Sequence, residues 1–364
     1  DELGNLDSTF NEDGMLVMNF GYDSAGATGV AIDDFGRIVV VGSVLLPLPP
    51  GAPPHTFPPS DFAVARFLAD GTPDPDFHMP DGPAGLVTVD FGWNDYAAEV
   101  ALQSDGKIVV VGSTYAARVI PPQYSGALSR LDENGQLDPA FGANGDGRVV
   151  TSGPRYPSLA FDHVAMDPSD NIVVAGHLTY GAGTGDPGRL VAVARYTPGG
   201  VLDPGFGASG MVTSDFGADG GIVDVAVQRD GRIVVAGSVY DPITEAFDFA
   251  LMRYNIDGSL DDGGPTDLTP SDWFGAGGHV ATDFASTSDT AYAVAIQADG
   301  KIVAAGEAAS GTGSDFALAR YEGGTTMIED LPHIVDVLRW KPGPVKILVA
   351  LGGQGTGTAG DDLA

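Results

Sequence analysis

Asp105-Gly106-Lys107-Ile108-Val109-Val110-Val111-Gly112-Ser113 is a phrase that recurs along most of the chain. Its second glycine has one counterpart in every copy, at Gly42, Gly112, Gly176, Gly237 and Gly306. Subtraction gives 70, 64, 61 and 69 residues between successive copies, a period typical of propeller blades with long loops. The 364 residues therefore predict one repeat array, in which each unit shares its core with its neighbours, and not a set of unrelated domains.

Each repeat contains four short apolar stretches separated by Gly, Asp and Pro, which predicts four strands and no helix. The first stretch, as in residues 100–102, has small residues at its centre, which suit a strand crowded against its equivalents around a central axis. The second is the near-continuous apolar run from Ile108, so both of its faces should be buried. Because Asp105-Gly106 between them is a strong hairpin signal, these two strands should pair.

The phase of the repeat predicts how the array ends. It starts with a segment of the fourth type, residues 15–20, and finishes with one of the third type, residues 315–321. If the N-terminal segment supplies the outermost strand of the last unit, residues 1–322 close into a five-bladed β-propeller of four-stranded blades without a long exposed edge. An open solenoid is the alternative. Residues 323–364 should form a tail or linker with one strand at 345–351. The innermost strands are expected near Ala27, Ala97, Phe161, Ile222 and Ala291.

The repeated phrases resemble the delta-60 repeat family of bacterial proteins over residues 3–322. Asp-Gly-Lys-Ile-Val, Asp-Phe-Ala-Leu-Ala-Arg-Tyr and Leu-Asp-x-x-Phe-Gly occur in the family's order. The resemblance implies a propeller-like β fold in large secreted or surface proteins and no assigned activity. The third repeat departs most from the pattern, since Asp170-Asn171 stands where the others have Gly-Lys or a close variant.

Composition narrows the classes of partner. The chain has 49 acidic and 17 basic residues, a formal net charge of −32 and a pI near 4.1, so nucleic acid and anionic membranes are poor partners. Cysteine is absent, which excludes disulfides, thiolate zinc sites and thiol nucleophiles. No apolar run is long enough to insert in a membrane. The acidity and a start at Asp1, without Met, lead us to expect a secreted or cell-surface protein; a trimmed chain is the alternative.

Five arginines occupy one register of the third stretch: Arg66, Arg130, Arg195, Arg253 and Arg320. A ring of them could bind an anion. We expect a structural role instead, because a buried guanidinium needs a partner and the turns of the repeat supply carboxylates such as Asp138 and Asp203.

The repeated aspartates offer hard oxygen ligands in glycine-rich turns, which calcium prefers. Aspartates in such turns also make local hydrogen bonds to the backbone, and we favour this role. No cofactor is therefore expected, and calcium is the alternative. Residues 357–363 weakly resemble one copy of a glycine-aspartate calcium repeat, with a flexible interdomain linker as the alternative.

No nucleophile elbow, zinc-protease motif or phosphate loop occurs. The six histidines fall at unrelated phases of the repeat, although His163 and His177 lie near adjacent strands and could meet. The nonrepeated loops between second and third strands are the expected contact surface. The candidate contact residues are Trp93, Tyr115, Tyr124 and Tyr240.

The array, the acidity and the lack of a catalytic constellation predict a noncatalytic extracellular scaffold or adhesion propeller that contacts protein or glycan at a cell surface, within a larger assembly. A polysaccharide hydrolase or lyase is one alternative, supported if two or three nonrepeated carboxylates or histidines face the mouth of the channel. A carbohydrate-binding propeller is another, favoured if Trp93, Tyr115 or Tyr124 forms an exposed aromatic platform.

Overall fold

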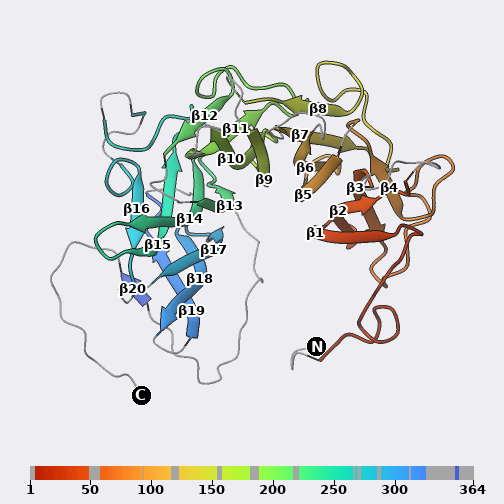
Figure 1. Ribbon diagram of the computed structural model, residues 1–364, viewed down its shortest axis with the longest axis horizontal. Coiled ribbons are helices and arrows are strands. Elements are labelled where there is room, and N and C mark those ends of the chain that lie inside the picture. Colours follow the sequence, from red (N-terminus) through yellow and green to blue (C-terminus); the bar gives the residue numbers. More distant parts are fainter. Residues whose placement is uncertain are drawn as a thin grey trace.

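The computed structural model describes residues 5–48, 58–92, 94–115, 123–153, 158–180, 188–215, 221–264, 267–268, 272–284, 288–310, 313–324 and 349–351. The regular secondary structure within these residues consists of β-strands. They form five four-stranded sheets that follow one another along the chain (Figure 1). The prediction of an all-β, propeller-like array of five four-stranded units is confirmed.

Each sheet is built from four strands that are consecutive in sequence. The first contains β1 (Ser24–Ile32), β2 (Ile38–Leu45), β3 (Ser60–Phe67) and β4 (Leu86–Val89). The second contains β5 (Asn94–Leu102), β6 (Ile108–Tyr115), β7 (Tyr124–Leu131) and β8 (Arg148–Thr151). The third contains β9 (Ser158–Met166), β10 (Ile172–Tyr180), β11 (Gly188–Tyr196) and β12 (Met211–Ser214). The fourth contains β13 (Gly221–Val227), β14 (Ile233–Asp241), β15 (Ala246–Tyr254) and β16 (His279–Thr282). The fifth contains β17 (Asp289–Ile296), β18 (Ile302–Ser310), β19 (Gly313–Tyr321) and β20 (Val349–Leu351).

The repeated glycine is required by a close approach of two backbones. A Cβ atom on Gly112 would lie 2.0 Å from the carbonyl oxygen of Tyr96 on the paired strand β5. A β-bulge between Ala97 and Glu99 shifts the pairing register at this point, and the equivalent bulge is present in all five sheets. The glycine that reveals the repeat in the sequence is therefore the residue on which each first hairpin depends.

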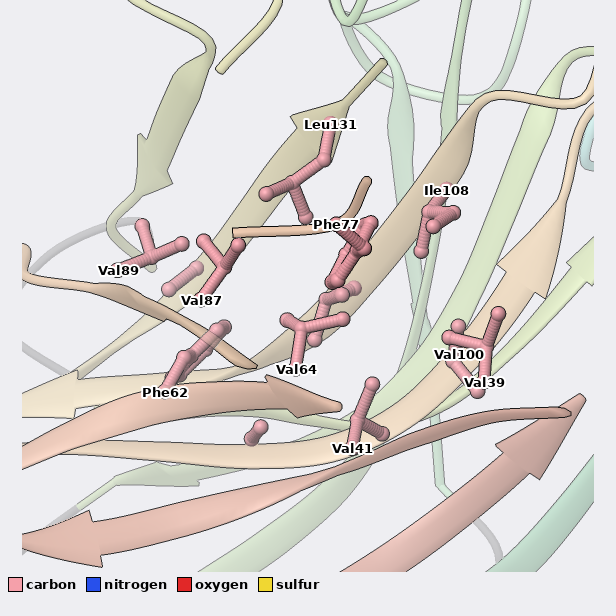
Figure 2. Close-up of a cluster of buried hydrophobic side chains, with 13 residues drawn as sticks. Val39, Val41, Phe62, Val64, Phe77, Val87, Val89, Val100, Ile108 and Leu131 are labelled. Atoms are coloured by element: carbon pink, nitrogen blue, oxygen red, sulfur yellow. The ribbon is translucent and has the colours of Figure 1, made fainter. Parts of the chain in front are cut away.

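The core lies between neighbouring sheets, as the apolar run of each second strand predicts. Between the first two sheets, Phe62 and Val64 of β3 pack with Val100 and Ile108 of the second sheet (Figure 2). Phe62 is fully buried. Comparable clusters join each following pair of sheets. Burying a side chain of this size stabilises the fold by about 1.5–3 kcal/mol, so adjacent sheets depend on each other for stability.

The five sheets lie in an open arc, with the first and fifth sheets at its two ends (Figure 1). The first strands β1, β5, β9, β13 and β17 contact one another in that order, and the five positions expected on innermost strands lie within them. At the end of the arc no described sheet covers β19. Phe316 there is 86% exposed, whereas its counterparts Phe62 and Phe249 are completely buried against the next sheet.

The prediction that residues 15–20 complete the last blade is wrong. This segment forms no strand, and Leu16 and Phe20 pack on Ala65 and Phe67 of the first sheet. The fourth place in the fifth sheet is taken by β20, which pairs in parallel with β19. The apolar side chains of the N-terminal segment cover the free face of the first sheet, because that face has no preceding blade to bury it. In the described residues, no helix of the length and apolarity of a membrane span was found.

Candidate functional site

The repeated arginines are occupied by local contacts in four of the five sheets. Each pairs with a buried or half-buried aspartate eight residues later and lies over a phenylalanine ring, as in the pair of Arg253 Nε and Asp261 Oδ2 at 2.5 Å. The other pairs are Arg66 with Asp74, Arg130 with Asp138 and Arg195 with Asp203, at 2.8 to 2.9 Å. Arg320, in the last sheet, is exposed. This arrangement holds the turn before each fourth strand and pairs each of these four guanidinium groups with a carboxylate.

The bulges of the first strands place nonrepeated residues at equivalent positions. The residue after each bulge is Gly29, Glu99, His163, Asp224 or Ala293. In the third sheet the bulged residue itself is Asp162. The backbone geometry repeats here while the side chains change from sheet to sheet, so ionisable groups gather on the second, third and fourth sheets.

Five of these groups form what we call the inner-strand cluster: Glu99 on β5, Asp162 and His163 on β9, His177 on β10 and Asp224 on β13. His177 Nδ1 lies 2.8 Å from Asp162 Oδ2, and His163 Nδ1 lies 3.6 Å from Glu99 Oε2. All five side chains are half-buried. The sequence indicated that the two histidines could meet, and the structure brings each of them to a carboxylate, on the same strand pair or on the neighbouring sheet.

The cluster separates the proton affinities of its two aspartates. Burial acts to raise the pKa of Asp162, but its hydrogen bond with His177 and the charges of His177, His163 and Arg189 hold that pKa below its usual value. Burial raises the pKa of Asp224, and hydrogen bonds from the backbone nitrogens of Val294 and Val225 only partly offset this. The cluster therefore contains a readily ionised carboxylate and one that retains its proton more strongly, both of which interact with His163, and this is the division needed for acid–base work.

The pKa of His163 is also shifted within the inner-strand cluster. Burial acts to lower the pKa of His163, but the hydrogen bond with Glu99 and the charges of Glu99, Asp224 and Asp162 raise it above the ordinary value. The imidazolium form is therefore favoured between carboxylates of three adjacent sheets.

An aromatic row crosses the second sheet. The rings of Tyr96 and Tyr115 are stacked, with centroids 6.0 Å apart and planes 8° apart, and the ring of Tyr124 lies 4.9 Å from that of Tyr115. Tyr96 is 42% exposed. Two residues of this row, Tyr115 and Tyr124, were sequence candidates, whereas Tyr96 was missed because its place depends on the register of the bulged hairpin. Tyr240 instead packs edge-on against Phe247, and Trp93 lies outside the described residues.

Carboxylates also converge at two boundaries between sheets. Asp61, Asp90 and Asp95 meet between the first and second sheets, and Asp248, Asp283 and Asp289 meet between the fourth and fifth. In each group, one carboxylate oxygen of every residue lies within 4.8 Å of the other two. Such oxygen sets are the ligands that calcium uses in proteins.

Comparison with known families agrees with the repeat. The chain matches the family model described as a domain of unknown function (DUF5122) beta-propeller at residues 56–77, 103–141, 168–206, 228–263 and 297–323, one segment in each repeat. These matches support a propeller-repeat family. They do not establish membership of the narrower delta-60 repeat family, which the sequence resembles.

Individual relatives are distant. A protein of frog virus 3 (isolate Goorha), named "Putative deoxyuridine 5′-triphosphate nucleotidohydrolase", is 28% identical over 129 residues, which are 35% of this chain and 72% of that protein. The xylan beta-1,4-xylosidase of Bacillus halodurans C-125 is 13% identical with a TM-score of 0.36, over 65% of this chain and 44% of that one. The K499G mutant of NanB sialidase from Streptococcus pneumoniae is 9% identical with a TM-score of 0.44, over 80% and 54%. This chain thus spans about half the length of these two enzymes, and their low scores carry no argument about its chemistry.

The prediction of a noncatalytic scaffold is corrected. It rested on the lack of a catalytic constellation, and the inner-strand cluster brings nonrepeated carboxylates and histidines of three sheets together. The solved structures found to be similar, all distant, are named as a xylosidase, a sialidase, arabinanases and a family 43 glycoside hydrolase, and none is named as a scaffold or adhesion protein.

Proposed function

We propose that this chain is a polysaccharide-active propeller whose acid–base site is the inner-strand cluster. The observation that carries the proposal is the opposite pKa shift of two aspartates that both interact with His163: the pKa of Asp162 is lowered and that of Asp224 is raised. Glycoside hydrolysis needs this pair, because one carboxyl must donate a proton to the departing oxygen while another is ionised.

Roles follow from these shifts. Asp224 donates its proton to the glycosidic oxygen as the bond to the anomeric carbon breaks, and that oxygen leaves as a hydroxyl. Asp162, ionised and held by His177, takes the proton of the water that attacks the same carbon. The charge of His163 acts to lower the pKa of both aspartates, and the charge of Glu99 acts to raise that of Asp224.

The aromatic row supports a second candidate, glycan binding without hydrolysis. Sugar rings present apolar C–H faces that pack on aromatic rings, and Tyr96 offers an exposed ring stacked on Tyr115. The same row would hold a chain for hydrolysis, so the two candidates differ in the need for the inner-strand cluster and not in the need for the tyrosines.

Release of reducing ends from a panel of xylans, arabinans and sialylated glycans tests the proposal. Asp162→Asn and Asp224→Asn should each lower the rate about 100-fold or more. Asp105→Asn is the matched control, since Asp105 is an exposed turn aspartate that pairs with Lys107. Far-ultraviolet circular dichroism and a melting curve establish that each variant is folded.

Binding to the same panel separates the candidates. Loss of binding in Tyr96→Ala with no hydrolysis by the wild-type protein would favour a binding module. Hydrolysis that survives both asparagine substitutions would remove the catalytic assignment, and a folded protein that neither binds nor cleaves any glycan would remove both.

Two finer assignments belong to the same proposal. Membership of the delta-60 family is supported by the order of its three phrases along the repeats. Location outside the cell, with glycan or protein as partner, is supported by the net charge of −32. Fractionation of the producing cells with an antibody to this chain tests the location, and recovery in the cytosol alone would contradict it.

A further inference from the structure

The two aspartate groups at the sheet boundaries occupy the same place in the repeat. Asp61 and Asp248 lie at the start of third strands, β3 and β15. Asp90 and Asp283 follow the paired fourth strands, and Asp95 and Asp289 lie on the first strand of the next sheet. Each group therefore joins two carboxylates of one sheet to one of its neighbour, at a boundary that can be followed from β3 and β4 to β5 in Figure 1.

Four of the six carboxylates are buried, while Asp90 and Asp283 are exposed. Asp95 and Asp289 are completely buried, and Asp61 and Asp248 are 6% exposed. Oδ2 of Asp95 accepts a hydrogen bond from the backbone nitrogen of Phe91 at 2.7 Å, and Oδ2 of Asp289 accepts one from that of Phe284 at 2.8 Å.

Oδ1 of Asp248 is buried without a hydrogen bond to a described protein atom, and Oδ1 of Asp95 and of Asp289 have no well-aligned one, although the Thr114 hydroxyl and the backbone nitrogen of Ala309 act to lower the pKa of Asp95 and Asp289. Thr114, which acts to lower the pKa of Asp95, likewise has a buried hydroxyl without such a bond. An unpaired buried carboxylate oxygen is costly, and a bound cation would satisfy it.

The negative charge of the Asp248 group is also not compensated by a basic side chain of the described residues. Burial, followed by the charges of Asp283, Asp241 and Asp289, raises the pKa of Asp248 to about 6, and no basic group contributes. Burial and the charges of Asp90 and Asp95 raise the pKa of Asp61 to about 6 as well. In the first group Arg148 compensates part of the charge, since it acts to lower the pKa of Asp95, and it also donates to the carbonyl oxygen of Asp90 and pairs with Asp146.

The other boundaries serve as an internal comparison. Between the second and third sheets the register positions of Asp61 and Asp90 hold Ser125 and Ser152, whose hydroxyls lie 3.1 Å apart, and that of Asp95 holds the buried Leu159. The three carboxylates are absent together at this boundary, whereas between the third and fourth sheets Leu190 stands at the position of Asp61 and Asp215 keeps the position of Asp90.

We propose that the two aspartate groups are calcium sites that clamp adjacent sheets. The donors are hard carboxylate oxygens, which suit Ca²⁺, and three of them leave room for carbonyl oxygens and water to complete six to eight ligands. Mg²⁺ fits less well because it demands near-ideal octahedral geometry and gives up its water reluctantly. The local role favoured from the sequence holds for Asp90, one oxygen of which caps the nitrogen of Gly92, but not for Asp61 or Asp248.

Titration of the chelator-treated full chain with CaCl₂ in a calorimeter tests the proposal. We expect two bound Ca²⁺ per chain in the wild-type protein and one in each of Asp61→Asn and Asp248→Asn. Asp299→Asn, which changes an exposed turn aspartate paired with Lys301, should still bind two. A stoichiometry that is unchanged in both cluster variants, or silence up to millimolar Ca²⁺, would overturn the proposal.

Melting curves provide a second readout that separates metal binding from a structural role. The Tm of the wild-type protein should rise with Ca²⁺ concentration, as for any ligand bound only by the folded state. In excess chelator, Asp248→Asn should melt at the same temperature as wild type or higher, because it removes a repelling charge, and it should gain less from Ca²⁺. Equal losses with and without Ca²⁺ would mean that Asp248 is a structural residue and would contradict the clamp.

Discussion

Glu99 Oε2 on β5 accepts a hydrogen bond from the backbone nitrogen of Val164 on β9, at 2.7 Å across the boundary between the second and third sheets. Asp224 does the same for Val294 between the fourth and fifth sheets, also at 2.7 Å. The carboxylates of the inner-strand cluster therefore join neighbouring sheets as well as lying beside the histidines. This double role makes the cluster rigid, as a site for acid–base chemistry needs to be.

The pairing of His163 with Glu99 predicts a pH dependence of stability. The folded-state pKa of His163 is raised above 6.5, so the folded chain binds this proton more tightly than the unfolded chain does. Its contribution to stability is full below the unfolded pKa and is lost as pH rises through the folded pKa. Urea unfolding from about pH 5 to pH 9 should show this loss in the wild-type protein and a flatter curve in His163→Gln. An unchanged pH profile in that variant would contradict the assignment.

The arginine–aspartate pairs predict a contrast within one repeat register. Arg253 is 1% exposed and faces the completely buried Asp261, so Arg253→Ala leaves a buried carboxylate short of its main partner. We expect a loss of about 3–5 kcal/mol in the free energy of unfolding. Arg320→Ala, at the equivalent exposed position, should stay within about 0.5 kcal/mol of the wild type. Similar losses for both variants in urea titrations would show that burial is not what makes the pair important.

The repeated glycine predicts a second contrast. Gly112→Ala would place a Cβ atom 2.0 Å from the carbonyl oxygen of Tyr96, and backbone must move to admit it. Gly106→Ala meets no atom within 4 Å and should cost only the strain of a positive φ, about 1–2 kcal/mol. We expect Gly112→Ala to be the more destabilised in urea unfolding, or to fail to fold while Gly106→Ala is recovered folded. Equal stability of the two would mean that the hairpin tolerates a wider spacing.

The residue patterns predicted the strands within each repeat better than the arrangement at the two ends of the array. Asp105-Gly106 and the run from Ile108 predicted the first hairpin, since turn chemistry and burial on both faces are local properties. The segment 15–20 has the residues of a fourth strand but lies on the first sheet. Its apolar pattern is satisfied by either apolar surface, so the sequence could not decide between the two. Whether the tail begins at residue 323 stays a prediction.

The candidate functional residues also fall into two groups, those that the sequence could place and those that needed the structure. Tyr115 and Tyr124 face each other at the end of one hairpin, so the pair could have been inferred from its register, while Tyr96 required the bulge to be known. The aspartate groups could have been aligned from the repeat, but their separation could not.

Sequence alone determined the repeat, the four strands in each unit and the glycine on which each first hairpin depends, because period, turn residues and close backbone approach are written in neighbouring positions. Tertiary structure alone decided that Glu99, His163 and Asp224 form one cluster, since they come from three sheets and are about 60 residues apart along the chain. Packing of one sheet on the next brings them together, and a chain read in one dimension does not contain that contact.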